Sequence, residues 1–146
     1  MLLSNDRGQL RRFYFTAWRK YRERRPMEPL EHQVAELIAR HPEYHALFDT
    51  DPDRAEAVLQ RDYLPESGQT NPFLHLGLHL GLLEQVTADR PAGIRAVYQA
   101  LRDRCGDSHE AEHRMMACLA EMIWQAQRDG ALPDEAVYME SLRRLV

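Results

Sequence analysis

Helical periodicity is the feature of this sequence that most restricts its fold. Apolar residues recur three and four positions apart along the chain, and no stretch alternates apolar and polar residues as a half-buried strand does. We therefore expect an all-α protein, a compact helical bundle of about five to seven helices with short connections. The spacing predicts helices over residues 6–24, 30–40, 51–59, 72–88, 92–105, 108–128 and 134–145, with a short helix after Pro42.

Several helix ends are predicted by residues that favour caps or breaks. Asn71 and Asp107 each stand immediately before a helical pattern, and Gly130 stands just after one. Pro42 ends the helix that precedes it, because the residue before a proline is pushed out of the helical region. His41 is therefore expected at a junction between two helices.

The composition is that of a soluble protein of one domain. The 146 residues are 44% hydrophobic and 29% charged, and the two cysteines, Cys105 and Cys118, indicate no disulfide framework. No stretch near the start resembles a signal peptide, and the longest apolar run, Phe73–Leu83, is too short to cross a bilayer. We expect a single domain over 1–146, located in the cytoplasm, without a transmembrane segment.

Charge is distributed unevenly along the chain. Residues 1–25 hold eight arginines and lysines against two acidic residues, whereas the remainder carries an excess of acidic groups. The simpler interpretation is that a basic, aromatic N-terminal helix packs on an acidic body of the protein. The alternative is a non-catalytic interaction module, in which this Arg-rich helix contacts a phosphate-bearing or acidic partner, a nucleic acid or an anionic lipid.

Six of the seven histidines fall into pairs spaced four residues apart, whereas random placement would give about 0.3 such pairs. Residues four apart lie on the same face of a helix, so two imidazoles can reach one metal ion. The helices over 72–88 and 108–128 are separated by one other helix, so they run parallel in an alternating bundle. Their histidines, within roughly the first 12 Å of each helix, should then lie at the same end. The pairs are His41/His45, His75/His79 and His109/His113.

The sequence therefore predicts a transition-metal site of unknown catalytic role. Imidazoles with a few carboxylates suit zinc, iron, manganese or nickel, and with enough carboxylates the site could hold two irons. The alternative is that each histidine is a structural residue with one hydrogen bond. Glu43 and Glu84 are further candidate carboxylates. The predicted ligands are His75, His79, His109 and His113, with Glu112, His45 and His41 as auxiliaries.

One of these segments also fits the zinc-peptidase pattern His-Glu-x-x-His, over His109-Glu110-Ala111-Glu112-His113. Such peptidases bind the substrate backbone along an edge strand, and no strand is expected here. A peptidase is therefore a minor alternative.

Three stretches are similar to a known family: His41-Pro42-Glu43-Tyr44-His45, Arg61 to His75 with His79, and Glu110 to Met116. They resemble a bacterial family catalogued as domain of unknown function 1841, and the likeness extends over nearly the whole chain. The resemblance implies a bacterial, cytosolic, stand-alone domain and no particular activity. The metal hypothesis therefore depends on the residues alone.

Overall fold

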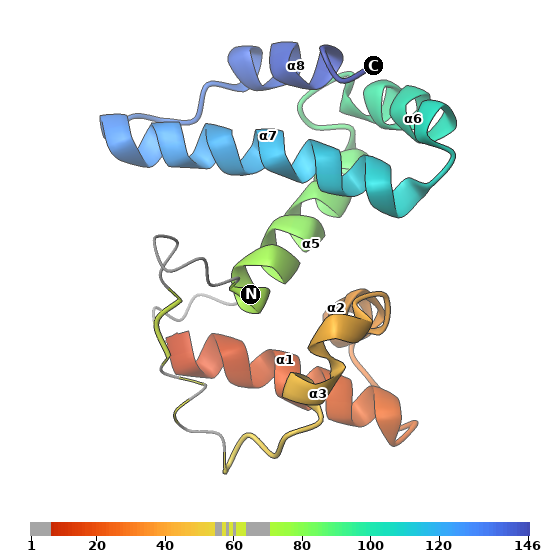
Figure 1. Ribbon diagram of the computed structural model, residues 1–146, viewed down its shortest axis with the longest axis vertical. Helices are drawn as coiled ribbons and strands as arrows, with labels where there is room; N and C mark the ends of the chain where they lie inside the picture. Colours follow the sequence, from red (N-terminus) through yellow and green to blue (C-terminus); the bar gives the residue numbers. More distant parts are fainter. Residues whose placement is uncertain (1–6, 55–56, 58, 60, 64–70) are drawn as a thin grey trace. The chain divides into compact units, whose positions relative to one another are not determined.

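The computed structural model describes residues 7–54, 57, 59, 61–63 and 71–146, and within them it contains helices and no strand (Figure 1). The expected all-α class is confirmed. The predicted helix over 51–59 lies partly outside the described residues. The helices are α1 (Arg7–Arg22), α2 (Pro29–Ala39), the 3₁₀ turn η1 (Pro42–Tyr44), α3 (His45–Phe48), α5 (Pro72–Ala88), α6 (Ile94–Cys105), α7 (Ser108–Asp129) and α8 (Glu135–Arg143).

Two compact units make up the chain, residues 1–76 and 77–146, and the boundary between them falls inside α5. Each unit has buried apolar side chains of its own, so each is described by itself. The single domain expected over 1–146 stays a prediction.

In residues 1–76, helix α1 packs against α2 and α3. The contact with α3 is aromatic, since the rings of Phe15 and Phe48 meet edge to face at 5.1 Å, and Trp18 of α1 is 2% exposed. The Trp18 indole N–H donates to Asp49 Oδ1 at 2.8 Å, so its one polar atom is satisfied. The apolar face of α1 thus fixes the position of α2, whose last residues lead to His41.

The basic face of α1 makes ion pairs with acidic residues of the same unit. Arg12 contacts Asp53 at 2.7 Å, and Arg19 contacts Asp51 at 3.2 Å. Similar pairs join Lys20 to Glu31, Arg22 to Asp49 and Arg7 to Asp62. These contacts agree with electrostatic packing of the N-terminal helix on acidic parts of the protein.

In residues 77–146, α7 packs against α6 and α8 around an apolar core. Helix α7 begins where Asp107 accepts a hydrogen bond from the His109 N–H, and it ends at Gly130, whose φ of 61° suits glycine. The completely buried residues of this core are Leu82, Ile94, Leu101, Ala111, Met115 and Leu142.

Helix α5 does not run parallel to α7, as an alternating bundle would require, but crosses it steeply (Figure 1). That expectation was wrong. Within residues 77–146, His79 is the histidine of α5 that meets α7. No described helix is long and apolar enough to cross a membrane.

Candidate metal centre

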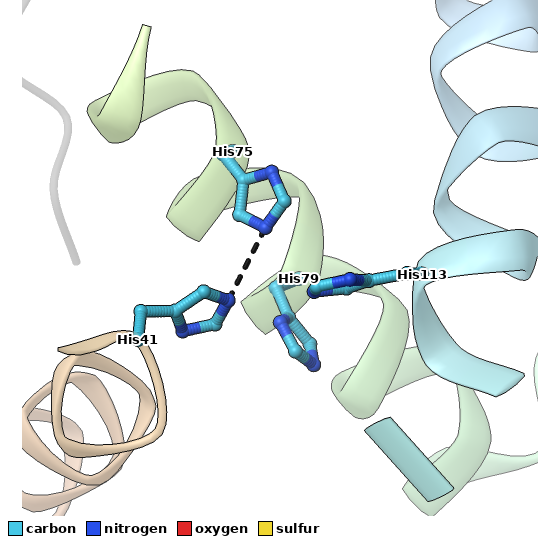
Figure 2. Close-up of side chains that lie close together, drawn as sticks. All are labelled: His41, His75, His79 and His113. Carbon is cyan, nitrogen blue, oxygen red and sulfur yellow. Dashed lines mark hydrogen bonds between the residues drawn. The ribbon is translucent and has the colours of Figure 1, made fainter. Parts of the chain in front are cut away.

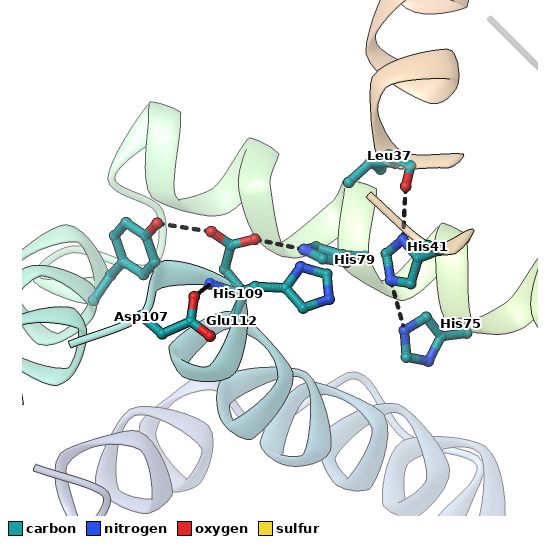
Figure 3. A network of polar contacts seen from close by, with 8 residues as sticks. Leu37, His41, His75, His79, Asp107, His109 and Glu112 are labelled. Carbon is teal, nitrogen blue, oxygen red and sulfur yellow. Dashed lines mark hydrogen bonds and ion pairs between the residues drawn. The ribbon is translucent and has the colours of Figure 1, made fainter. Parts of the chain in front are cut away.

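A buried contact between α5 and α7 forms the centre of the candidate site. His79 Nε2 lies 2.5 Å from Glu112 Oε1, and the exposed fractions of the two residues are 0% and 2% (Figure 3). A carboxylate is costly to bury unless its oxygens are hydrogen-bonded. The second oxygen, Oε2, accepts a hydrogen bond from the Tyr98 hydroxyl at 2.8 Å. Glu112 is therefore held between an imidazole of α5 and a phenol of α6.

The environment of Tyr98 is consistent with a carboxylate beside it. Burial and, after it, the hydrogen bond to Glu112 raise the pKa of Tyr98 above its ordinary value. The hydroxyl therefore remains a donor at neutral pH, and it fixes the direction of Oε2. As a consequence, Oε1 is the oxygen that faces His79.

Two further imidazoles of α7 adjoin this pair. The ring of His79 lies 5.4 Å from that of His109 and 5.3 Å from that of His113, and the two α7 rings are 4.1 Å apart. Both α7 histidines are partly exposed, whereas His79 is completely buried. One ligand atom each of His79, His109 and Glu112 lies within 4.8 Å of the other two.

These spacings are close to those of a metal site. Ligand atoms about 2.0–2.1 Å from a tetrahedral ion are about 3.3 Å apart, and the centroids of two coordinating imidazoles are then about 5.2 Å apart. The two centroid distances from His79, 5.4 and 5.3 Å, match this value. The His79–Glu112 contact would open by about 1 Å for both atoms to bind one ion. Two imidazoles and a carboxylate therefore fit a divalent cation after a small side-chain rotation.

The other half of the α5 histidine pair lies in residues 1–76. His75 Nε2 is 3.2 Å from His41 Nε2 (Figure 2), and His41 Nδ1 is 2.6 Å from the Leu37 carbonyl oxygen (Figure 3). His41 lies between α2 and η1, as Pro42 predicts. Within residues 1–76, His75 thus contacts His41, and within residues 77–146, His79 contacts α7.

His45 does not join either group. Its Nε2 lies 2.8 Å from the Ile38 carbonyl oxygen, and its ring lies against Trp18 with 4.7 Å between centroids. The carboxylates of Glu43 and Glu84 belong to exposed residues. Of the predicted auxiliaries, Glu112 and His41 contact another predicted ligand, whereas His45 contacts Ile38 and Trp18 of its own unit.

Nothing in the sequence indicates that Tyr98 belongs to the candidate site. It stands on the apolar stripe of α6, where a tyrosine is an ordinary core residue. No local pattern connects it to Glu112, because the two are 14 residues apart on different helices. The one available signal was chemical, since a buried carboxylate requires donors and a nearby phenol supplies one.

Comparison with known proteins identifies the family. The model of the family described as domain of unknown function (DUF1841) matches residues 6–144, and the chain belongs to that family. The comparisons find no match among the curated proteins or among the solved structures.

Proposed function

We propose that the protein binds a divalent transition-metal ion through His79, His109 and Glu112, with the ring of His113 beside them. The observation that carries this proposal is the buried His79–Glu112 contact with a nitrogen of His109 within 4.8 Å of both ligand atoms. A negative carboxylate beside imidazoles attracts a divalent cation, and this attraction offsets the free-energy cost of burying the cation's charge.

The donor set restricts the choice of ion. Imidazole nitrogen and carboxylate oxygen suit zinc, iron(II), manganese(II) and nickel(II), and neither cysteine belongs to the group, which disfavours copper(I). Two imidazoles and one carboxylate leave coordination positions open, as in catalytic zinc sites and in iron(II) oxygenases. A bound ion would therefore keep a position for water or substrate.

The contacts of Glu110 argue against the peptidase alternative. In that pattern the glutamate beside the first histidine activates a metal-bound water. Here Glu110 is half-exposed and its Oε1 lies 2.7 Å from Arg114 at the surface. The described residues also contain no strand that could hold a peptide substrate.

The ion pairs of α1 argue in the same way against the interaction-module alternative. A basic helix that binds phosphate groups needs arginines available to the partner. Arg12, Arg19 and Arg22 each contact an aspartate within 3.6 Å in the same unit. A partner would have to displace these contacts, so metal binding is the better supported function.

The test compares two carboxylates of the same helix. Isothermal titration calorimetry with zinc on the untagged full chain measures the affinity. The affinity of one site should fall at least tenfold in Glu112→Gln and in His109→Ala. Glu110→Gln, two residues away on the exposed face, is the matched control and should bind zinc as the wild type does. Equal zinc binding by all four proteins would refute the proposed ligands.

A further inference from the structure

The His41–His75 contact in residues 1–76 has the geometry of a second pair of metal ligands. Its two Nε2 atoms are 3.2 Å apart. Neighbouring ligand atoms on a tetrahedral zinc ion are about 3.3 Å apart, so these nitrogens already stand at ligand spacing. This differs from the His79–Glu112 contact, which has to open before both atoms can bind one ion.

The Leu37 carbonyl determines which nitrogen of His41 can bind a cation. A carbonyl oxygen can only accept, so the contact of 2.6 Å requires the proton of neutral His41 to be on Nδ1. The lone pair is then on Nε2, the atom that faces His75. A hydrogen bond from the far nitrogen to a backbone carbonyl is also the usual way in which proteins orient a metal-binding imidazole.

The two rings are held in place by Tyr44. Its ring stacks on His41 with 5.6 Å between centroids and 11° between planes, and it meets His75 nearly edge-on at 5.9 Å. The two imidazoles themselves are inclined by 78°. His41 is 1% exposed, whereas His75 is partly exposed and leaves a side open to water. Little side-chain entropy is therefore lost when a cation binds, which favours affinity.

We propose that His41 and His75 bind a second divalent cation, with zinc as the probe ion and water completing its coordination. In the metal-free pair, His75 Nε2–H donates to His41 Nε2, because His41 has its proton on Nδ1. Binding requires His75 to carry its proton on Nδ1 instead, so that both Nε2 lone pairs face the ion. Both rings stay neutral, and no net proton is released. All of the contacts that carry this proposal lie within residues 1–76.

Metal counting on the full chain tests the proposal. Equilibrium dialysis against zinc, followed by elemental analysis, should give two ions per wild-type chain and one in His75→Ala. His32→Ala is the matched control, because His32 forms an exposed surface pair with Glu36 at 3.6 Å, and it should keep both ions. His41→Ala should also bind one ion. If this substitution disturbs the end of α2, His75→Gln serves as the second variant and should bind one ion as well.

The outcomes separate the two sites. A second site is supported if His75→Ala and His109→Ala each lose one ion and the double variant loses both. It is also supported, with the first site refuted, if zinc binding survives in His109→Ala and disappears in His75→Ala. The proposal is overturned if His75→Ala keeps the wild-type count, if the same single ion disappears in both variants, or if His32→Ala removes an ion.

Discussion

Glu112→Gln tests the buried contacts of the candidate site before any metal is added. In the wild type, two donors face the two carboxylate oxygens, His79 Nε2–H at 2.5 Å and the Tyr98 hydroxyl at 2.8 Å. Glutamine has the same shape but offers one oxygen, which can accept from His79, and one NH₂ group, which can donate to the hydroxyl oxygen of Tyr98. Two charge-assisted hydrogen bonds are therefore replaced by two neutral ones.

The expected loss of stability follows from these contacts. A hydrogen bond to a charged group contributes about 1.5–3 kcal/mol and a neutral one about 0.5–1.5 kcal/mol, so the free energy of unfolding should fall by about 1–3 kcal/mol in Glu112→Gln. For a chain of this size the midpoint of thermal unfolding should fall by roughly 2–10 °C. The assay is urea unfolding in the presence of a chelator, monitored by circular dichroism. Glu110→Gln, whose carboxylate is exposed, should change stability by less than about 0.5 kcal/mol.

A double-mutant cycle separates the loss of the charge-assisted bonds from other effects of the substitution. If the weaker hydrogen bonds cause the loss, Tyr98→Phe should cost less stability in the Glu112→Gln background than in the wild type, because the hydroxyl then gives up a neutral hydrogen bond and not a charge-assisted one. Additive effects of the two substitutions would refute this reasoning. So would a Glu112→Gln protein as stable as the Glu110→Gln control.

Three further predictions concern the rest of the fold. The hydrogen bond from Lys20, followed by that from the Glu28 N–H, lowers the pKa of Glu31 below its ordinary value of 4.5. The ionised carboxylate of Glu31 therefore contributes its full stabilisation above pH 4.5, and this contribution is lost as pH falls through the lowered pKa. Glu31→Gln should destabilise the protein near pH 7 and have little effect near pH 2, as measured by urea unfolding at each pH. Met115→Ala should lower the free energy of unfolding by about 2–5 kcal/mol, because this completely buried side chain would leave a cavity in the core; thermal and urea unfolding of the variant check this. Trp124 is 54% exposed, so Trp124→Gln should change the free energy of unfolding by less than about 0.5 kcal/mol in the same assay.

The positions of the helices could be predicted from the sequence because the interactions that define a helix are local. Helix α7 begins after Asp107 and ends before Gly130, and Pro42 separates α2 from the turn that follows, all as expected. Helical hydrogen bonds and caps join residues at most a few positions apart, so spacing alone contains this information. The four-residue repeat of the histidines likewise placed each of His75/His79 and His109/His113 on a single helix.

The partners of these side chains were decided by the tertiary structure. The sequence could not indicate that His79 meets Glu112, because the crossing angle of α5 and α7 depends on how whole helix faces pack. It also could not indicate that His75 meets His41, which is 34 residues away along the chain. Nor could it assign Tyr98 to Glu112. The sequence alone determined where the helices lie along the chain and which histidines are spaced four residues apart. Long-range packing decided which of them come within ligand distance, since contacts between distant segments leave no periodic signal in the chain.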